Sequence, residues 1–243
     1  MSILGFVTML FYNIIFMLIA TLIIATITLT ERKVLALVQR RVGPNFVGYK
    51  GRLQYLADAG TRWAYHNVYV KLQDVVSSAT GQTWNTYFNT KLRDKIGMNT
   101  NGFWFTNTDG NRIYWSTTRS MARFGLLALN KGKWNSSIIL NENYFNEATS
   151  TSQTINQSYG YLWWLNGKTS YHLPQTQLQF NGSLVPTAPN DMFCALGKND
   201  QKIYIVPSKK MVVIRMGDPA DSSNLALSTF DEVLWQKINT LYQ

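Results

Sequence analysis

The sequence has few of the residues from which disulfides and metal sites are built. Its 243 residues include one cysteine, Cys194, and two histidines, His66 and His172. A single cysteine excludes an internal disulfide, and its apolar neighbours in residues 192–196 predict a small buried thiol rather than a nucleophile. The histidines have no Cys, Asp or Glu at ligand spacing, so we expect no metal site.

Other absences are local and divide the chain. Residues 1–59 contain none of the eight tryptophans, only six of the 23 Lys and Arg, and only two of the 13 Asp and Glu. No charged side chain occurs between Ile3 and Leu29. This change in composition predicts two parts, residues 1–59 and 60–243, joined near Ala59 and Gly60.

The chain carries a net charge of +10 at pH 7. Such an excess is compatible with nucleic acid or an anionic membrane surface as a partner. The basic residues form no long run and no nucleic-acid motif. We therefore expect a solvated basic surface and a basic cluster beside a membrane, and no nucleic-acid partner.

Residues 3–29 predict one N-terminal transmembrane helix. At about 1.5 Å per residue the run reaches roughly 40 Å, enough to cross a hydrocarbon core of about 30 Å with tilt. A signal peptide fits less well, because no basic residue precedes this long run. The basic residues that begin at Arg32 place this end in the cytoplasm or the mitochondrial matrix. Membrane lipid is thus an expected partner.

Three short motifs follow the apolar run. Residues 31–35 read ERKVL, residues 39–45 read QRRVGPN, and residues 53–58 read LQYLAD. In order and spacing they closely resemble subunit 1 of respiratory NADH:quinone oxidoreductase (complex I), and the resemblance covers residues 1–59. It implies ubiquinone as cofactor, other complex I subunits as partners, and the mitochondrial inner membrane or bacterial plasma membrane as location.

The same resemblance implies that four side chains lie near the quinone chamber: Glu31, Gln39, Arg41 and Asp58. Arg41 can hold a carboxylate in a bidentate pair, and a buried Asp58 can tune protonation. The alternative is that these charges only anchor a loop at the membrane interface. The family continues with further membrane helices, but no second apolar span of membrane length follows here. We expect this chain alone to bind no cofactor.

Residues 60–243 alternate helix and strand patterns. We predict helices over residues 67–79, 83–95, 117–131 and 141–148, and a closing helix that starts at Ser223 or Asn224. A strand pair surrounds Asp109-Gly110, residues 160–165 form a strand, and residues 202–207 and 211–216 form a hairpin. Helices against an antiparallel sheet give an α+β fold class.

Six motifs of this part occur in the order of one family. They are WAYHN at 63–67, TGQ at 80–82, IGM at 96–98, MARFG at 121–125, YGYLWW at 159–164 and QKIYIVPS at 201–208. Together they resemble the serine β-lactamase and penicillin-binding-protein family, class C and esterase type. The resemblance implies a catalytic base at Tyr65 and a substrate-orienting amide at Asn67, the remnant of a Tyr-x-Asn motif.

The nucleophile of that family is missing. No Ser-x-x-Lys occurs in the chain; Ser116 and Ser120 are followed three residues later by Arg119 and Arg123, and arginine does not become a neutral base. Because these partners are missing, we favour the simpler interpretation, in which Tyr65 is a buried tyrosine and Asn67 is a helix N-cap. We therefore expect an incomplete β-lactamase-like domain that lacks the nucleophile segment.

Three interpretations follow. The first is a composite chain, in which a complex I subunit 1-like segment is joined to a truncated β-lactamase-like domain without hydrolase activity of its own. The second is a membrane-anchored pseudo-hydrolase or binding domain. The third is a complex I membrane-arm subunit with a replaced C-terminus. We favour the first, because patterns agree within each part and disagree across the junction.

Mass spectrometry of a tryptic digest from the natural source distinguishes a covalent junction from two separate chains. Cleavage after Arg52 and Arg62 releases one peptide across the junction, Leu53 to Arg62. Detection of this peptide establishes the fusion. Flanking peptides from both parts without it, in a digest in which a synthetic standard is detected, would show that the parts belong to different chains.

Overall fold

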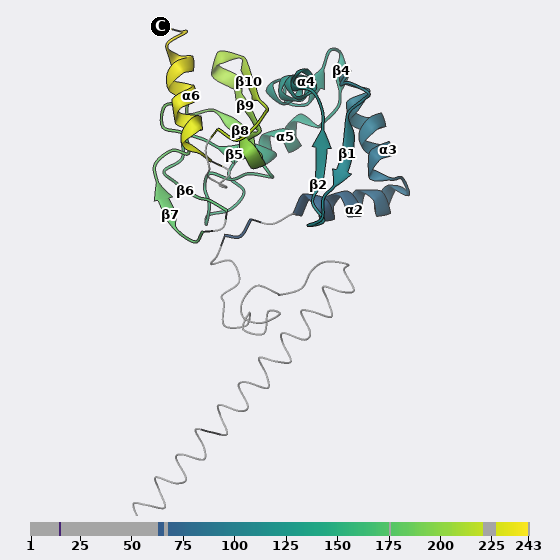
Figure 1. The fold of residues 1–243 in the computed structure, drawn as a ribbon, viewed down its shortest axis with the longest axis horizontal. Helices are drawn as coiled ribbons and strands as arrows, with labels where there is room; N and C mark the ends of the chain where they lie inside the picture. The colour runs from purple at the N-terminus through teal and green to yellow at the C-terminus, as the bar shows by residue number, and fades with distance from the viewer. Residues whose placement is uncertain (1–14, 16–62, 66–67, 175, 221–226, 243) are drawn as a thin grey trace, which may run out of the picture. The chain divides into compact units, whose positions relative to one another are not determined.

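The computed structural model describes residues 15, 63–65, 68–174, 176–220 and 227–242 (Figure 1). The chain divides into two compact units, residues 1–62 and 63–243. In the first unit only Ile15 is described, as an exposed helical residue. The transmembrane helix predicted over residues 3–29 thus lies outside the described residues. Among the residues that are described, no helix is long and apolar enough to cross a membrane.

A four-stranded antiparallel sheet forms the centre of the second unit, with strand order β10-β9-β8-β5. The strands are β5 (Trp164–Leu165), β8 (Phe193–Leu196), β9 (Lys202–Val206) and β10 (Met211–Arg215). β9 pairs with β10 from Val206↔Met211 to Lys202↔Arg215. The central strands β8 and β9 are rich in buried apolar residues, as strands covered on both faces must be.

Helices cover both faces of this sheet, and the alternation of side chains along β9 decides which face each helix meets. Ile203 and Ile205 belong to the cluster that includes Ala128 of α4 (Thr118–Leu129). Tyr204 packs instead against Trp235 of α6 (Thr229–Asn239), with ring centroids 5.6 Å apart. Figure 1 shows α4 and α6 on opposite sides of the sheet. The unit is therefore an α+β sandwich.

A second layer of elements lies beyond α4. It contains α2 (Val68–Thr80), α3 (Trp84–Phe88), the π-helix η3 (Asn89–Arg93) and the hairpin of β1 (Phe103–Thr106) and β2 (Arg112–Trp115). Phe88, Ile96 and Leu127 form the buried centre of its own core cluster. Figure 1 shows the hairpin beside α2 and α3, distant from α6.

Shorter elements complete the unit. They are β3 (Lys133–Trp134), β4 (Ser137–Ile138), α5 (Glu142–Ala148), β6 (Ser170–His172), β7 (Gln179–Asn181), and the 3-10 turns η4 (Lys198–Asp200) and η5 (Pro207–Lys209). The pairs β3–β4 and β6–β7 are small antiparallel hairpins. Neither pair was expected from the sequence, because two or three residues are too few to show an alternating pattern.

Several local predictions are confirmed. Both predicted hairpins form, the one around Asp109-Gly110 and the one over residues 202–216. Helices also begin near residues 83 and 117, where Thr83 and Thr117 cap α3 and α4 by accepting hydrogen bonds from the amides of Thr86 and Ser120. These elements depend on neighbouring residues, which is why the sequence alone reveals them.

Two predictions differ from the structure. The strand expected over residues 160–165 is reduced to Trp164–Leu165, because Leu162 adopts a left-handed φ of 64° and turns the chain. Gly160 allows this turn, since a Cβ there would lie 2.2 Å from the carbonyl oxygen of Ala148. The closing helix begins at Thr229, whereas its expected first residues, Ser223 and Asn224, lie outside the described residues.

Two adjacent leucines of α4 provide a matched test of the core. Leu127 is fully buried, whereas Leu126 is 42% exposed. We expect Leu127→Ala to lower the free energy of unfolding by about 2–5 kcal/mol because it leaves a cavity. Leu126→Ala makes the same change in helix propensity and should lower the free energy of unfolding by no more than about 0.5 kcal/mol. Urea unfolding measures both, and equal losses would contradict the assigned core.

Candidate functional site

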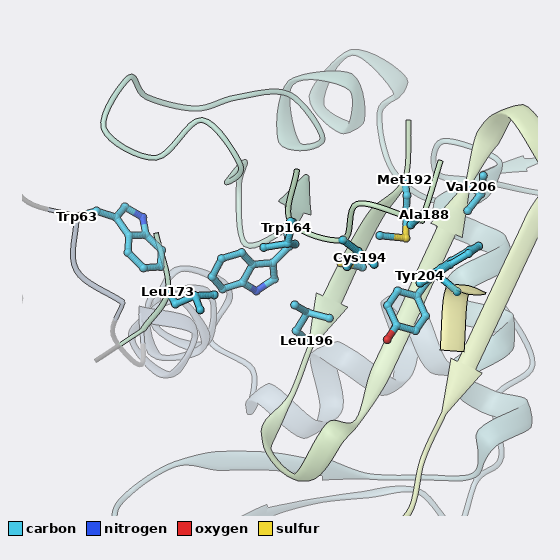
Figure 2. Packing of buried hydrophobic residues seen from close by; sticks show 12 residues of the cluster. Trp63, Trp164, Leu173, Ala188, Met192, Cys194, Leu196, Tyr204 and Val206 are labelled. Carbon is cyan, nitrogen blue, oxygen red and sulfur yellow. The ribbon is translucent and has the colours of Figure 1, made fainter. Parts of the chain in front are cut away.

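Tyr65 is the one predicted site residue that the structure describes. It precedes α2 and lies among aromatic rings: its centroid is 6.0 Å from each of Trp63, Tyr159 and Trp164, and it stacks on Trp164. Trp63 is held in turn by Gln177, whose Nε2 donates to the Trp63 carbonyl at 3.2 Å. Figure 2 shows Trp63 and Trp164 side by side at one end of the core cluster.

The electrostatic environment of Tyr65 favours the protonated phenol. Tyr65 is 38% exposed, and the partial burial of its phenol among the rings raises its pKa. A hydrogen bond with Tyr159 offsets only part of the rise. Burial likewise raises the pKa of Tyr159, and the Tyr65 phenol raises it further. A tyrosine that acts as a base near neutral pH needs a lowered pKa, which cationic neighbours supply. No lysine or arginine of the described residues lowers the pKa of Tyr65.

The other predicted site residues, Asn67, Glu31, Gln39, Arg41 and Asp58, lie outside the described residues. Their roles stay predictions. Within the part of the chain that the structure describes, no group of three or more His, Cys, Asp or Glu could hold a metal ion.

The end of β8 lies near the rings that contact Tyr65. Leu196, its last residue, shares a core cluster with Trp63 and Trp164 (Figure 2). The fold therefore brings this strand end to the aromatic wall around Tyr65, which is formed by Trp63, Tyr159 and Trp164. Lys198, two residues after the strand, is exposed in η4.

One of the two Ser-x-x-Arg patterns, Ser120-x-x-Arg123, holds structural contacts through both of its named residues. Ser120 is buried, and its Oγ accepts hydrogen bonds from the Asn99 amide at 2.9 Å and from Thr117 Oγ1 at 3.1 Å. Arg123 donates through Nη1 to the carbonyl of Ile96 at 3.3 Å. These contacts join α4 to the loop after η3, and they leave Ser120 without the exposure that a nucleophile needs.

A buried charged cluster lies on the side of β9 that faces α6, away from α4. It was not predicted from the sequence. Lys202 Nζ contacts Asp231 Oδ2 at 2.9 Å and Asp200 Oδ1 at 3.1 Å, and all three side chains are buried. The Tyr204 hydroxyl donates a short hydrogen bond to Asp231. Ser228 donates through its amide to Asp231 at 2.8 Å and through Oγ to Asp200 at 2.7 Å.

This cluster binds β9 to the start of α6 and to η4. Burial raises the pKa of Asp200. Hydrogen bonds from Ser228 and the Ala220 amide, together with the Lys202 charge, lower the pKa by more, so it lies below its usual value. The carboxylate therefore stays ionised beside its lysine. Lys202 is the first residue of a strand whose other four residues are apolar or aromatic, and that position was the available signal of a buried cation.

Cys194 of β8 is fully buried, as its apolar neighbours predict. Burial raises the pKa of its thiol, which suppresses the reactive thiolate. A separate apolar cavity of about 90 Å³ lies between α4, α5 and Trp163, with Phe124, Leu140 and Phe145 in its lining. Neither feature contains one of the predicted site residues.

Comparisons with known proteins assign the N-terminal part. The NADH dehydrogenase family matches residues 11–74. NADH-ubiquinone oxidoreductase chain 1 of Paramecium tetraurelia is 80% identical over 51 residues, which is 21% of this chain and 20% of that protein. The chain 1 protein of Podospora anserina is 62% identical over 40 residues, or 16% of this chain and 11% of that protein. The chain thus spans a fifth or less of these curated relatives.

Solved structures match the second part. A Bacillus anthracis protein described as a 6-aminohexanoate-dimer hydrolase has a TM-score of 0.55 and 22% identity, over 85% of this chain and 52% of that one. A β-lactamase from Mycobacterium bovis has a TM-score of 0.56 and 16% identity, over 78% of this chain and 68% of that one. At these identities the likeness shows the fold, and the chain spans only about half of the first structure.

The comparisons confirm both resemblances. The chain contains a complex I subunit 1-like segment and a domain of β-lactamase-like α+β fold, consistent with a composite chain. The NADH dehydrogenase match ends at residue 74, within α2, so it overlaps the beginning of the second unit.

Lys202→Met tests the buried charged cluster. Removal of the lysine leaves two buried carboxylates without their cation, so we expect a loss of about 3–5 kcal/mol in the free energy of unfolding at neutral pH. Lys198→Met, at an exposed position four residues earlier, should change it by no more than about 0.5 kcal/mol. Denaturant unfolding at neutral pH compares the two variants.

The difference in the free energy of unfolding between wild type and Lys202→Met should also depend on pH. Because the folded pKa of Asp200 lies below the ordinary aspartate value of about 3.9, its contribution is present above that value and is lost as pH falls through the lowered pKa. The difference in the free energy of unfolding between wild type and Lys202→Met should therefore become smaller in acid. A difference that stays constant down to strongly acidic pH would contradict the ion pairs.

Proposed function

We propose that the chain is a composite in which neither part has a complete catalytic apparatus, and that residues 60–243 do not turn over serine-hydrolase substrates. The observation that carries this proposal is the environment of Tyr65. Its described neighbours are aromatic, and its pKa is raised rather than lowered. Tyr65, the candidate base of the Tyr-x-Asn motif, therefore keeps its proton near neutral pH.

The chemistry of acyl transfer explains why this matters. A serine attacks a carbonyl only when a neighbouring base accepts its proton. The chain has no Ser-x-x-Lys, and Ser120 of the Ser-x-x-Arg pattern is buried and accepts a hydrogen bond from the Asn99 amide. Asn67 remains a candidate for orienting a substrate amide. A site that has neither a nucleophile nor a base can bind such a substrate but cannot cleave it.

For residues 1–59 we propose a wall segment of a quinone chamber. The support is the identity to proteins named NADH-ubiquinone oxidoreductase chain 1 and the family match over residues 11–74. In this proposal Glu31, Gln39, Arg41 and Asp58 face ubiquinone, other complex I subunits supply the rest of the chamber, and the location is the mitochondrial inner membrane. Electron transfer belongs to that assembly, because one membrane segment cannot perform it alone.

A membrane-anchored binding domain is the second candidate for the whole chain. It is favoured by the internal consistency of residues 63–243, which have a covered sheet and a hydrogen-bonded charged cluster. In this alternative the transmembrane segment is an anchor. A complex I membrane-arm subunit with a replaced C-terminus is the third, and it has no support from the second unit.

Hydrolysis assays test the proposal directly. We expect the purified chain to hydrolyse nitrocefin and p-nitrophenyl esters no faster than heat-denatured protein at equal concentration. Tyr65→Phe removes the phenol but keeps the ring among its aromatic neighbours, so its rate should equal that of the wild type. Turnover by the wild type that Tyr65→Phe abolishes would overturn the proposal and identify Tyr65 as a catalytic residue.

A further inference from the structure

The β1–β2 hairpin has one face that is apolar and open to solvent. Phe103 pairs with Trp115, and Phe105 pairs with Ile113, so all four side chains project from the same face of the ribbon. Their exposed fractions are 57%, 59%, 48% and 42%. Isolated exposed apolar residues are common, but four registered neighbours, three of them aromatic, form a patch that indicates an interaction surface.

The opposite face anchors the ribbon. Trp104 and Tyr114 alternate with the exposed residues and pack on Phe88, at centroid distances of 5.3 and 4.7 Å. An ion pair between Arg112 and Asp74, 2.7 Å long, also ties β2 to α2. The exposed face is therefore presented by a fixed ribbon rather than by a loose loop.

We propose that this exposed hairpin face docks on an anionic phospholipid surface. Aromatic side chains favour the region between headgroups and acyl chains, where they bury apolar area while the flanking polar groups stay hydrated. The elements around the patch, residues 68–117, contain five cationic and three acidic side chains, and the whole chain has a net charge of +10. An anionic surface complements both the apolar face and this charge.

The same chain is predicted to contain a membrane segment. The charge-free run at residues 3–29 predicts an embedded segment, and the 33 residues 30–62 separate it from Trp63 in the sequence. A stretch of 33 residues can span at most about 110–120 Å, so its length does not prevent the hairpin from reaching the same bilayer. A second copy of the chain is a poorer occupant, because it brings the same positive charge to the contact.

This inference goes beyond the proposed function, since it needs neither hydrolysis nor a quinone site. Spin labelling of the full chain tests it, because Cys194 is buried and an added cysteine can be labelled selectively. The test variant is Phe103→Cys. The matched control is Leu178→Cys, which replaces another large apolar side chain that is 67% exposed but lies before β7. Both carry a nitroxide and are placed in nanodiscs, where both bilayer faces are open to solvent.

Collision with a water-soluble nickel complex and with oxygen reports where each label lies. In discs of phosphatidylcholine with phosphatidylglycerol, we expect the label at position 103 to lose nickel accessibility and gain oxygen accessibility, while the label at 178 stays exposed to nickel. In discs of phosphatidylcholine alone, the protection at 103 should diminish.

Three results would overturn the proposal. Equal nickel accessibility at 103 and 178 would show that the hairpin stays in water. Equal protection in both lipid mixtures would remove the role of anionic headgroups. Dipolar broadening between labels at 103, lost on dilution with unlabelled chain, would show that a second copy covers this face.

Discussion

The structure of residues 63–243 depends on the pairing of Lys202 with two buried aspartates. A lysine in the central strand would carry an isolated charge into the core, at a cost of several kcal/mol, if Asp200 and Asp231 did not meet it at 3.1 and 2.9 Å. Because Asp231 belongs to α6, the same contact fixes the C-terminal helix against the sheet. Tyr204 and Trp235 then close the apolar layer around the cluster.

The same strand explains how the unit separates structural and candidate functional regions. Lys202 and Tyr204 face α6, whereas Ile203 and Ile205 face α4. The aromatic wall around Tyr65 forms at the end of the α6-side cluster, where Trp63 and Leu196 take part in the same packing. The polar interactions of the charged cluster thus hold elements together, and the described surroundings of Tyr65 consist of aromatic rings.

The two parts of the chain differ in what their relatives explain. A short N-terminal stretch has high identity to a complex I subunit, of which the chain spans a fifth. Structural similarity at low identity over most of the chain shows a β-lactamase-like fold and does not extend to activity. The proposal for residues 1–59 thus rests on sequence identity, and the proposal for residues 60–243 rests on the surroundings of Tyr65.

By itself the sequence determined both family resemblances, the α+β class of the second part, the helices that begin near Thr83 and Thr117, and the two long hairpins. These depend on local periodicity, capping and turn residues, which act over a few positions. Only the tertiary structure decided that Leu162 turns the chain, that Lys202 is buried between two aspartates, and that the described neighbours of Tyr65 are aromatic rings. Each of these depends on residues distant in sequence, because burial and partners exist only once the elements pack.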